Sequence, residues 1–337
     1  MSAVTANDLA EKDVETQDGS EYAIEVVDLN KFYGPYHALH DLSFNVRKGE
    51  ILGFLGPNGA GKTTTMRILT GYMPPTSGEA YVAGYDVFDE SIQVRQHIGY
   101  LPETVPLYLD MTVWDYLEFA ARLHHVADIE DAVERAMELV NIEDRADMLI
   151  GKLSKGYRQR VGIAQAIVHE PDVLILDEPT IGLDPRQIIE VRELIKSLGK
   201  EHTILLSTHI LPEVSATCSR VVIINKGQIV AEDTPERLAG QLRGANRIHL
   251  QVVKPAPEIP STLEKVKGIL AVQARDEGVY EIETTLNADR RAEIAQVVVQ
   301  QGWGLLELRP VSVSLEEVFV ELTMQEQPQA SVETKQA

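Results

Sequence analysis

An apolar run, Ile51–Leu55, is followed directly by Gly56-Pro57-Asn58-Gly59-Ala60-Gly61-Lys62-Thr63. This octapeptide fits G-x-x-x-x-G-K-[ST], the pattern of a phosphate-binding loop between a buried strand and a helix. Its glycines let backbone N–H groups turn inward around phosphates without a Cβ clash, and the helix that follows adds the positive end of its dipole. Lys62 is expected to contact the β- and γ-phosphates, and the Thr63 hydroxyl to ligate Mg²⁺. The pattern predicts nucleotide binding, against the alternative of a glycine-rich turn with a solvated lysine.

Two acids end a second apolar run. Val173–Leu176 is followed by Asp177 and Glu178. A buried strand that stops on acids exposes them at its carboxyl end, where ligands sit in open α/β sheets. We therefore predict that Asp177 holds Mg²⁺ and that Glu178 polarises an attacking water. The alternative is an acid pair at the start of a helix, and the phosphate loop favours the catalytic interpretation.

The pattern around these motifs predicts an α/β domain at residues 22–240 with a largely parallel sheet, because β-rich runs alternate with helical stretches. Residues from about 104 to 170 read as mostly helical and predict a helical subdomain inserted into the sheet domain. The buried strands are predicted at Ile51–Leu55, Val173–Asp177, Thr203–Ser207 and Val221–Asn225.

A second, smaller α+β domain is predicted at residues 245–324. Its runs read as strand, helix, strand, strand, helix and strand, which is the ferredoxin-like order, followed by a closing helix at SLEEVFVELT, residues 314–323. Residues 1–21 form an acidic extension with little to bury, and residues 325–337 are polar, so both ends are predicted to be disordered.

Composition limits the classes of function. The chain of 337 residues has 52 acidic side chains against 31 Lys and Arg, a net charge of −21, which disfavours nucleic acid as a partner. We expect no membrane-spanning helix, because no apolar run approaches the roughly 20 residues that a span needs. We expect no signal peptide either, because the N-terminus has neither a basic start nor an apolar stretch. A single cysteine, Cys218, fits the reducing cytoplasm.

Further motifs stand between and around the loop and the acids. Leu153-Ser154-Lys155-Gly156-Tyr157-Arg158-Gln159-Arg160 precedes a helical stretch, Pro179-Thr180-Ile181-Gly182-Leu183-Asp184 follows the acids, and Ser207-Thr208-His209 ends the next strand. With these segments the sequence resembles the ATP-binding subunits of ABC transporters. The resemblance covers about 210 residues in the expected order and implies a P-loop NTPase fold of the ABC type.

The resemblance implies a mechanism. Two such domains close head to tail, so that ATP on one phosphate loop, including Thr64, is capped by Ser154 and Gly156 of the other. Hydrolysis of the ATP then lets the pair reopen. His209 is implied to contact the γ-phosphate and hold the water, Asp184 to link the two sites, and Tyr33 to stack on adenine. The expected ligands are ATP and Mg²⁺, and the expected partners are a second copy or a related chain and a membrane permease.

Three positions depart from the general family pattern. Lys155 and Tyr157 replace two residues of the usual L-S-G-G-Q signature, and Glu103 stands where the family has glutamine. Glu103 can still offer oxygen to Mg²⁺. These variants are similar to those of ABC-2-type exporter ATPases, including the gliding-motility-associated group.

The segment from Pro106 to Tyr116 corresponds to the family's docking surface for the permease. Trp114, Tyr116 and Leu117 are predicted either to contact the permease there or to belong to the core of the helical insert. The role of residues 245–324 stays open between dimer stabilisation, regulator binding and packing.

Three functions compete at this point. The first is a transport ATPase at the cytoplasmic face of a membrane, docked on separate permease subunits. The second is a soluble ABC ATPase acting on ribosomes or DNA. That alternative is disfavoured by a single nucleotide domain, by the charge, and by only 90 positions between Thr64 and Ser154, too few for a long coiled coil. The third is a non-hydrolysing, ATP-dependent regulatory module, against which the intact Lys62, Asp177, Glu178 and His209 argue.

Overall fold

The computed structural model describes residues 21–241, 246–285 and 289–311. The predicted closing helix at 314–323 and the predicted disordered ends, apart from Glu21, lie outside these ranges. Contacts group the chain into two units, residues 1–50 with 63–205 and residues 51–62 with 206–337. The boundaries that we predicted for the domains stay predictions.

An antiparallel sheet that the sequence analysis did not anticipate lies in the first unit. Its order is β2-β1-β4-β5, with Val26 opposite Phe44 on one side and Ile24 opposite Val82 on the other. Several register shifts interrupt the β1–β2 ladder, which weakens the alternation that would announce two long strands. Its strands are β1 (Tyr22–Tyr33), β2 (Tyr36–Arg47), β4 (Ser77–Val82) and β5 (Tyr85–Asp86).

A six-stranded sheet holds the predicted buried strands, in the order β10-β9-β3-β8-β7-β6. The β3–β9 and β6–β7 pairs are parallel, and β10 is antiparallel to β9. All residues of β7 and β8 are buried, which explains the continuous apolar runs at 173–176 and 204–206. The strands are β3 (Ile51–Leu55), β6 (Ile98–Leu101), β7 (Val173–Asp177), β8 (Thr203–Thr208), β9 (Arg220–Asn225) and β10 (Gln228–Asp233), so the four predicted strands are confirmed to within one residue.

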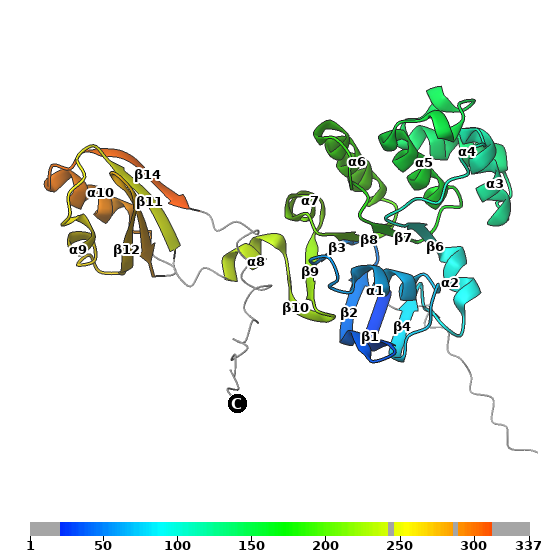
Figure 1. Ribbon diagram of the computed structural model, residues 1–337, viewed down its shortest axis with the longest axis horizontal. Coiled ribbons are helices and arrows are strands. Elements are labelled where there is room, and N and C mark those ends of the chain that lie inside the picture. Colours follow the sequence, from blue (N-terminus) through cyan, green and yellow to red (C-terminus); the bar gives the residue numbers. More distant parts are fainter. Residues whose placement is uncertain (1–20, 242–245, 286–288, 312–337) are drawn as a thin grey trace, which may run out of the picture. The chain divides into compact units, whose positions relative to one another are not determined.

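The helical segment of the first unit begins at a capped residue. Thr112 accepts a hydrogen bond from the Asp115 N–H at 3.1 Å, and the first helix starts one residue later. The helices before β7 are α1 (Lys62–Leu69), α2 (Ser91–His97), α3 (Val113–Leu123), α4 (Ile129–Val140), the 3-10 helices η1 (Glu143–Arg145) and η2 (Ile150–Lys152), and α5 (Lys155–Ile167); α6 (Pro185–Leu198), α7 (Leu211–Thr217) and α8 (Pro235–Gln241) follow. Figure 1 shows α3, α4 and α5 side by side.

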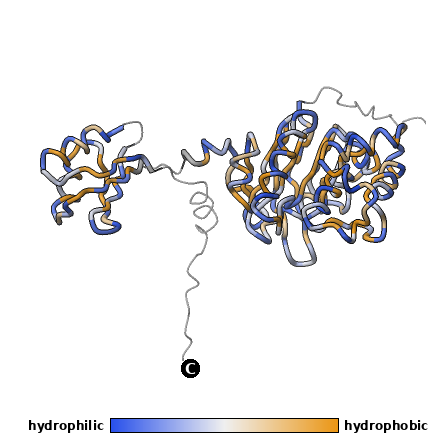
Figure 2. Tube along the Cα trace, turned by 90° about the horizontal axis from the view of Figure 1, so that it is seen from above, coloured by the Kyte–Doolittle hydropathy of each residue, from blue (hydrophilic) through white to orange (hydrophobic). Residues whose placement is uncertain are grey.

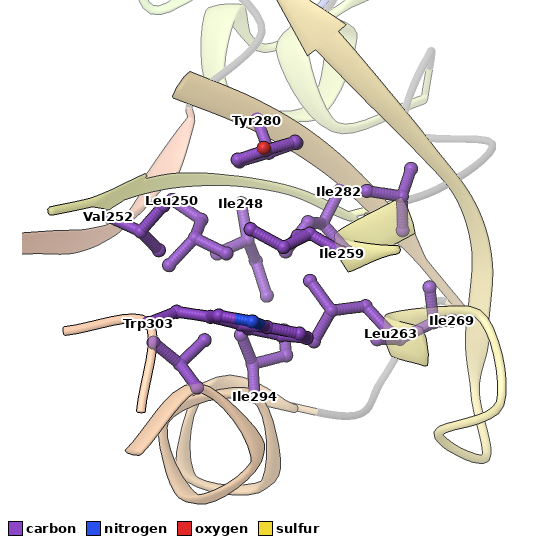
Figure 3. Close-up of a cluster of buried hydrophobic side chains, with 12 residues drawn as sticks. Ile248, Leu250, Val252, Ile259, Leu263, Ile269, Tyr280, Ile282, Ile294 and Trp303 are labelled. Carbon is purple, nitrogen blue, oxygen red and sulfur yellow. The ribbon is translucent and has the colours of Figure 1, made fainter. Parts of the chain in front are cut away.

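Residues 246–311 form a four-stranded antiparallel sheet in the order β12-β13-β11-β14, with two helices. Figure 3 shows the Trp303 ring between the sheet side chains Ile248 and Leu250 and the helix side chain Ile294. This buried cluster holds the helices against one face of the sheet. The elements are β11 (Asn246–Val252), α9 (Ile259–Leu263), β12 (Ile269–Asp276), β13 (Val279–Thr284), α10 (Arg291–Gln300) and β14 (Leu305–Val311).

Hydrophobic segments lie mostly toward the inside and hydrophilic segments mostly at the outside in Figure 2. In the part of the chain that the structure describes, no helix is both long enough and apolar enough to span a membrane.

Candidate nucleotide-binding site

The phosphate loop connects the end of β3 to the start of α1, as the sequence predicts. The Gly56 N–H donates to the Thr208 carbonyl at 3.3 Å. A Cβ built on Gly56 would lie 2.5 Å from the Ile224 carbonyl oxygen, so only glycine fits there. The space in which a side chain would extend from Gly59 is open, with no atom within 4 Å of a built Cβ. The loop therefore keeps its backbone accessible, as phosphate recognition requires.

Lys62 begins α1 with its side chain turned back into the loop. Its Nζ donates to the Gly56 carbonyl at 2.8 Å and lies 3.4 Å from the Pro57 carbonyl. Only 6% of the residue is exposed, so the ammonium is held at the loop instead of extending into solvent. This fixed cation next to accessible backbone amides fits a bound phosphate chain.

A cavity of about 900 Å³ brings together the three residues that we predicted as magnesium ligands. Thr63, Glu103 and Asp177 all line it. Asp177 is fully buried at the end of β7. One hydroxyl and two carboxylates are hard oxygen ligands, and Mg²⁺ typically takes one or two carboxylates and completes its shell with phosphates and water. The donor set therefore fits Mg²⁺ bound together with a nucleotide. Among the described residues, no group of three or more His, Cys, Asp or Glu is placed to hold a metal by itself.

Tyr100 also lines this cavity, and its surroundings raise its pKa. Burial of the phenol, followed by the negative charge of Asp177, raises the pKa of Tyr100 to about 12, and Glu103 adds to the rise. The nearby Arg67 acts in the opposite direction. Asp177 and Glu103 thus place negative charge near the Tyr100 phenol.

Glu178, the predicted catalytic carboxylate, has an unusual backbone conformation. It follows β7 directly, is 4% exposed, and has a φ of +51°. A left-handed φ is uncommon for a residue with a side chain and is often retained where it directs that side chain into a functional position. The sequence predicts the acid but not this strained turn.

The signature segment caps α5. The Ser154 hydroxyl accepts a hydrogen bond from the Tyr157 N–H at 3.4 Å, which makes Ser154 the N-cap. Gly156 is buried, and a Cβ built on it would lie 2.7 Å from the side chain of Gln187. Asp184 caps α6 by accepting from the Arg186 and Gln187 N–H groups, both at 3.0 Å. The structure therefore brings the start of α5 and the start of α6 into contact through Gln187.

Tyr33 lies at the end of β1 with 43% of its surface exposed. Its hydroxyl donates to the Met73 sulfur at 3.1 Å, and Lys31 Nζ lies 5.5 Å from its ring centroid. Phe32, its exposed neighbour, is stacked on His37 with ring centroids 3.8 Å apart. Because His37 covers a face of Phe32, Tyr33 is the better platform for a base.

His209 follows β8 and is partly buried. The turn after it is fixed by Thr208, whose hydroxyl donates to Glu213 at 2.9 Å and accepts from the Ile210 N–H at 3.1 Å. Thr64, the remaining residue of the predicted loop set, lies in the first turn of α1.

Two of the residues that we considered for permease contact belong to the core. Tyr116 is 4% exposed and Leu117 is fully buried on α3, so the core alternative holds for them, while Trp114 is only partly buried. The reason is the helical spacing, which turns positions 113, 116, 117 and 120 toward α4 and α5. The exposed apolar side chains nearby are instead Tyr108, Leu109 and Phe119.

Sequence reasoning also missed two histidines that line the cavity. His124 and His169 lie on it together with Arg67 and Arg95. No local pattern marks these histidines, because they come together from segments more than forty residues apart.

Comparisons with known proteins agree with the site. The family model described as "ABC transporter" matches residues 39–181. The chain is 35% identical over 302 residues to the bacitracin transport ATP-binding protein BcrA of Bacillus licheniformis, covering 89% of this chain and 96% of the relative. It is 30% identical over 308 residues to the linearmycin resistance ATP-binding protein LnrL of Bacillus subtilis (strain 168), covering 89% and 98%.

A solved structure of an ATP-binding subunit of an ABC transporter is 34% identical and superposes with a TM-score of 0.60, over 65% of this chain and 93% of that one. The chain belongs to the family of ABC transporter ATP-binding proteins. It is an ATP-binding and ATP-hydrolysing subunit of an ABC transporter, with the P-loop NTPase fold of that family. The predicted family, fold class and ATPase activity are thereby confirmed, and the ribosomal or DNA-directed and the regulatory alternatives are set aside.

Proposed function

We propose that this subunit powers export through a separate membrane permease of the ABC-2 type. The use of ATP as the energy source is carried by one observation: Thr63, Glu103 and Asp177 line one cavity, and Thr63 directly follows Lys62 of the phosphate loop. Export is supported by the relatives, one named for bacitracin transport and one for linearmycin resistance. The departures at Glu103, Lys155 and Tyr157 support the ABC-2 class.

Binding of ATP is assigned to the phosphate loop and Tyr33. Backbone amides from Gly56 to Gly61 and the Lys62 ammonium take the phosphates, while Tyr33 stacks on the adenine. Thr63 and Thr64, in the first turn of α1, add to the nucleotide contacts. Thr63, Glu103 and Asp177 are the residues that would hold Mg²⁺. Mg²⁺, when bound, neutralises charge that develops on the phosphate oxygens.

Hydrolysis is assigned to Glu178 and His209. The carboxylate of Glu178 accepts the proton of the attacking water or orients that water, and His209 contacts the γ-phosphate. The left-handed turn at Glu178 supports this role, because it fixes the carboxylate directly after the rigid strand β7.

A complete site needs two chains. Ser154 and Gly156 of one copy contact the γ-phosphate bound by the other, and Asp184 links the two sites. The second chain is a copy of this one or a related ATPase. Loss of the γ-phosphate removes the bridge and lets the pair reopen, which is the movement passed to the permease.

The mechanism is tested with Glu178→Gln in the full chain. We expect its Mg-dependent ATPase rate to fall by about 100-fold or more, since an acid–base residue contributes at least that much. We also expect ATP to convert it to a stable dimer, seen by light scattering after size exclusion. Glu193→Gln, a change at an exposed glutamate of α6, is the matched control and should behave as wild type. Unchanged turnover in Glu178→Gln, or no ATP-dependent dimer, contradicts the proposal.

The permease docks, in our proposal, on Tyr108, Leu109 and Phe119. Tyr108 is 57% exposed and packs edge-on against Phe119 with centroids 5.8 Å apart, which gives a preformed apolar patch. The chain's net charge of −21 suits the Lys- and Arg-rich loops that membrane proteins place on the cytoplasmic side. This puts the subunit at the cytoplasmic face of the membrane, with no nucleic acid among its partners.

Docking is tested by co-purification from membranes that contain the permease. The double variant Tyr108→Glu/Phe119→Glu should lose membrane association and keep ATP binding, whereas Phe88→Glu, at an aromatic 62% exposed elsewhere, should keep both. Retention of the double variant on membranes contradicts this surface.

For residues 245–324 we propose packing or dimer stabilisation as the role, within the boundaries predicted from the sequence.

A further inference from the structure

Lys155 stands in a strongly basic segment of an acidic chain. Residues 148–169 hold Lys152, Lys155, Arg158 and Arg160 and no Asp or Glu, although the whole chain has 52 acids. Lys155 is also the first residue of α5, where the helix dipole disfavours a cation. Helix stability therefore does not explain a lysine at this position.

The two arginines of the segment are used within the fold. Arg158 donates to the carbonyls of Ile150 and Gly151, at 3.2 and 2.7 Å. Arg160 donates to the Val140 carbonyl and to Glu190, both at 2.7 Å. Their guanidinium groups fasten the start of α5 to neighbouring segments and are not available to a ligand.

The Lys155 ammonium is positioned differently. The residue is exposed, and within residues 21–241, 246–285 and 289–311 it makes no ion pair or hydrogen bond. The tip of its side chain lies close to Gly182, since a Cβ built on Gly182 would be 2.2 Å from Lys155 Nζ. Gly182 has a φ of +67°, a conformation that favours glycine, and a side chain at this position would collide with the ammonium. The ammonium, which carries three N–H donors, therefore lies beside Gly182 of the 180–184 turn, on the residue that follows Ser154.

Asp184, the carboxylate within this turn, already accepts hydrogen bonds from backbone N–H groups. Asp184 Oδ1 accepts from two backbone N–H groups of its own helix. It thus serves as the cap of α6 and forms no ion pair with Lys155, which is exposed next to the exposed Ser154. An ammonium and a hydroxyl on adjacent residues suit an anion with several oxygens.

We propose that Lys155 is a binding residue for the γ-phosphate of ATP held by a second copy of this chain. The inference rests on the proposed head-to-tail dimer and adds to it a charged contact. It gives Lys155 the task of distinguishing ATP from ADP in the opposite site, because ADP lacks the terminal phosphate that the ammonium contacts. Lys155 thereby strengthens closure of the dimer without contacting the nucleotide that its own chain binds.

The test uses the full chain with Glu178→Gln, which removes turnover, and adds Lys155→Met. Methionine keeps an unbranched side chain of similar length and removes the charge. We expect the ATP concentration that gives half-maximal dimer to rise about tenfold or more, the loss expected for one charge-assisted hydrogen bond. We expect the difference from the parent to narrow as salt is added, because salt screens an exposed ionic contact. Lys155→Arg in place of Lys155→Met should bring the ATP concentration for half-maximal dimer most of the way back to that of the parent.

Two controls separate this role from a structural one. Lys152→Met removes another exposed lysine three residues earlier and should leave dimerisation unchanged. Binding of a fluorescent ATP analogue by dilute, monomeric Lys155→Met protein should equal that of the parent, and its thermal midpoint should not fall. A Lys155→Met protein that dimerises at the parent's ATP concentration overturns the inference. A Glu178→Gln parent that never dimerises with ATP overturns the proposed dimer, and the inference falls with it.

Discussion

The imidazole rings of His124 and His169 stack with their centroids 3.6 Å apart and their planes 12° apart. His169 Nε2–H donates to the Ile98 carbonyl at 3.1 Å, which fixes the ring beside β6. Burial, followed by the neighbouring His124, lowers the pKa of His169 to about 4, and burial also lowers the pKa of His124. The pair therefore remains neutral in the folded protein at pH values where exposed histidines take up protons.

This pair predicts a loss of stability in acid. Between pH 6.5 and about 4 the unfolded chain binds a proton at His169 and the folded chain does not, so the free energy of unfolding falls as the pH falls. One such proton contributes at most about 1.4 kcal/mol per pH unit. His169→Gln keeps an N–H donor and should flatten the dependence, measured by urea unfolding at several pH values. The same dependence in His169→Gln as in His125→Gln, a change at an exposed histidine, would contradict this assignment.

Gly56→Ala is predicted to abolish ATP binding. The added methyl group would lie 2.5 Å from the Ile224 carbonyl oxygen, so the loop must move away from the end of β9. We expect a loss of about 1–3 kcal/mol in the free energy of unfolding, the usual cost of overpacking. Titration with a fluorescent ATP analogue measures the binding. Normal ATP affinity in Gly56→Ala would refute the close approach.

Tyr33→Ala is predicted to raise the KM for ATP with a much smaller change in kcat. Loss of base stacking costs about 1–3 kcal/mol, which is roughly 5- to 150-fold in affinity. Tyr33→Phe should retain most of the affinity, since it keeps the ring and loses only the bond to Met73. Phe32→Ala should affect the KM less than Tyr33→Ala does, and the reverse order would assign the adenine to Phe32.

Trp303→Ala is predicted to destabilise the sheet of residues 246–311. Trp303 is 5% exposed within the cluster around Ile248, Leu250 and Ile294, and truncation of a buried Trp costs about 3–5 kcal/mol. Hydrogen exchange followed by mass spectrometry should show faster exchange in β11, β13 and α10. Val299→Ala, at a side chain 65% exposed on α10, is the control. Equal protection in the two variants would mean that Trp303 does not support this core.

Local sequence was sufficient where a single segment determines its own structure. The buried strands before Gly56 and after Glu170, the phosphate loop, and the helix that follows Ser154 were all predicted from short stretches. Each combines an apolar run of fixed length with a turn or cap residue of strong preference.

Features made by distant segments were not predicted. The β1–β2–β4–β5 sheet depends on the pairing of β1 with β4, which are distant in sequence, and the register between β1 and β2 is interrupted. The stacking of His124 on His169 and the placement of Lys155 against Gly182 both bring together residues from different elements. No short pattern encodes such contacts, because each depends on how the completed elements pack.

The missing side chain at Gly156 has a consequence for how the molecule moves. The amide of Gln187 fills the space beside Gly156 and, through its own helix start, completes the cap at Asp184. The first turns of α5 and α6 therefore touch without a spacer, and neither can slide without displacing the other. A shift of Ser154 at the start of α5 is therefore transmitted through Gln187 to Asp184 at the start of α6 in the same chain.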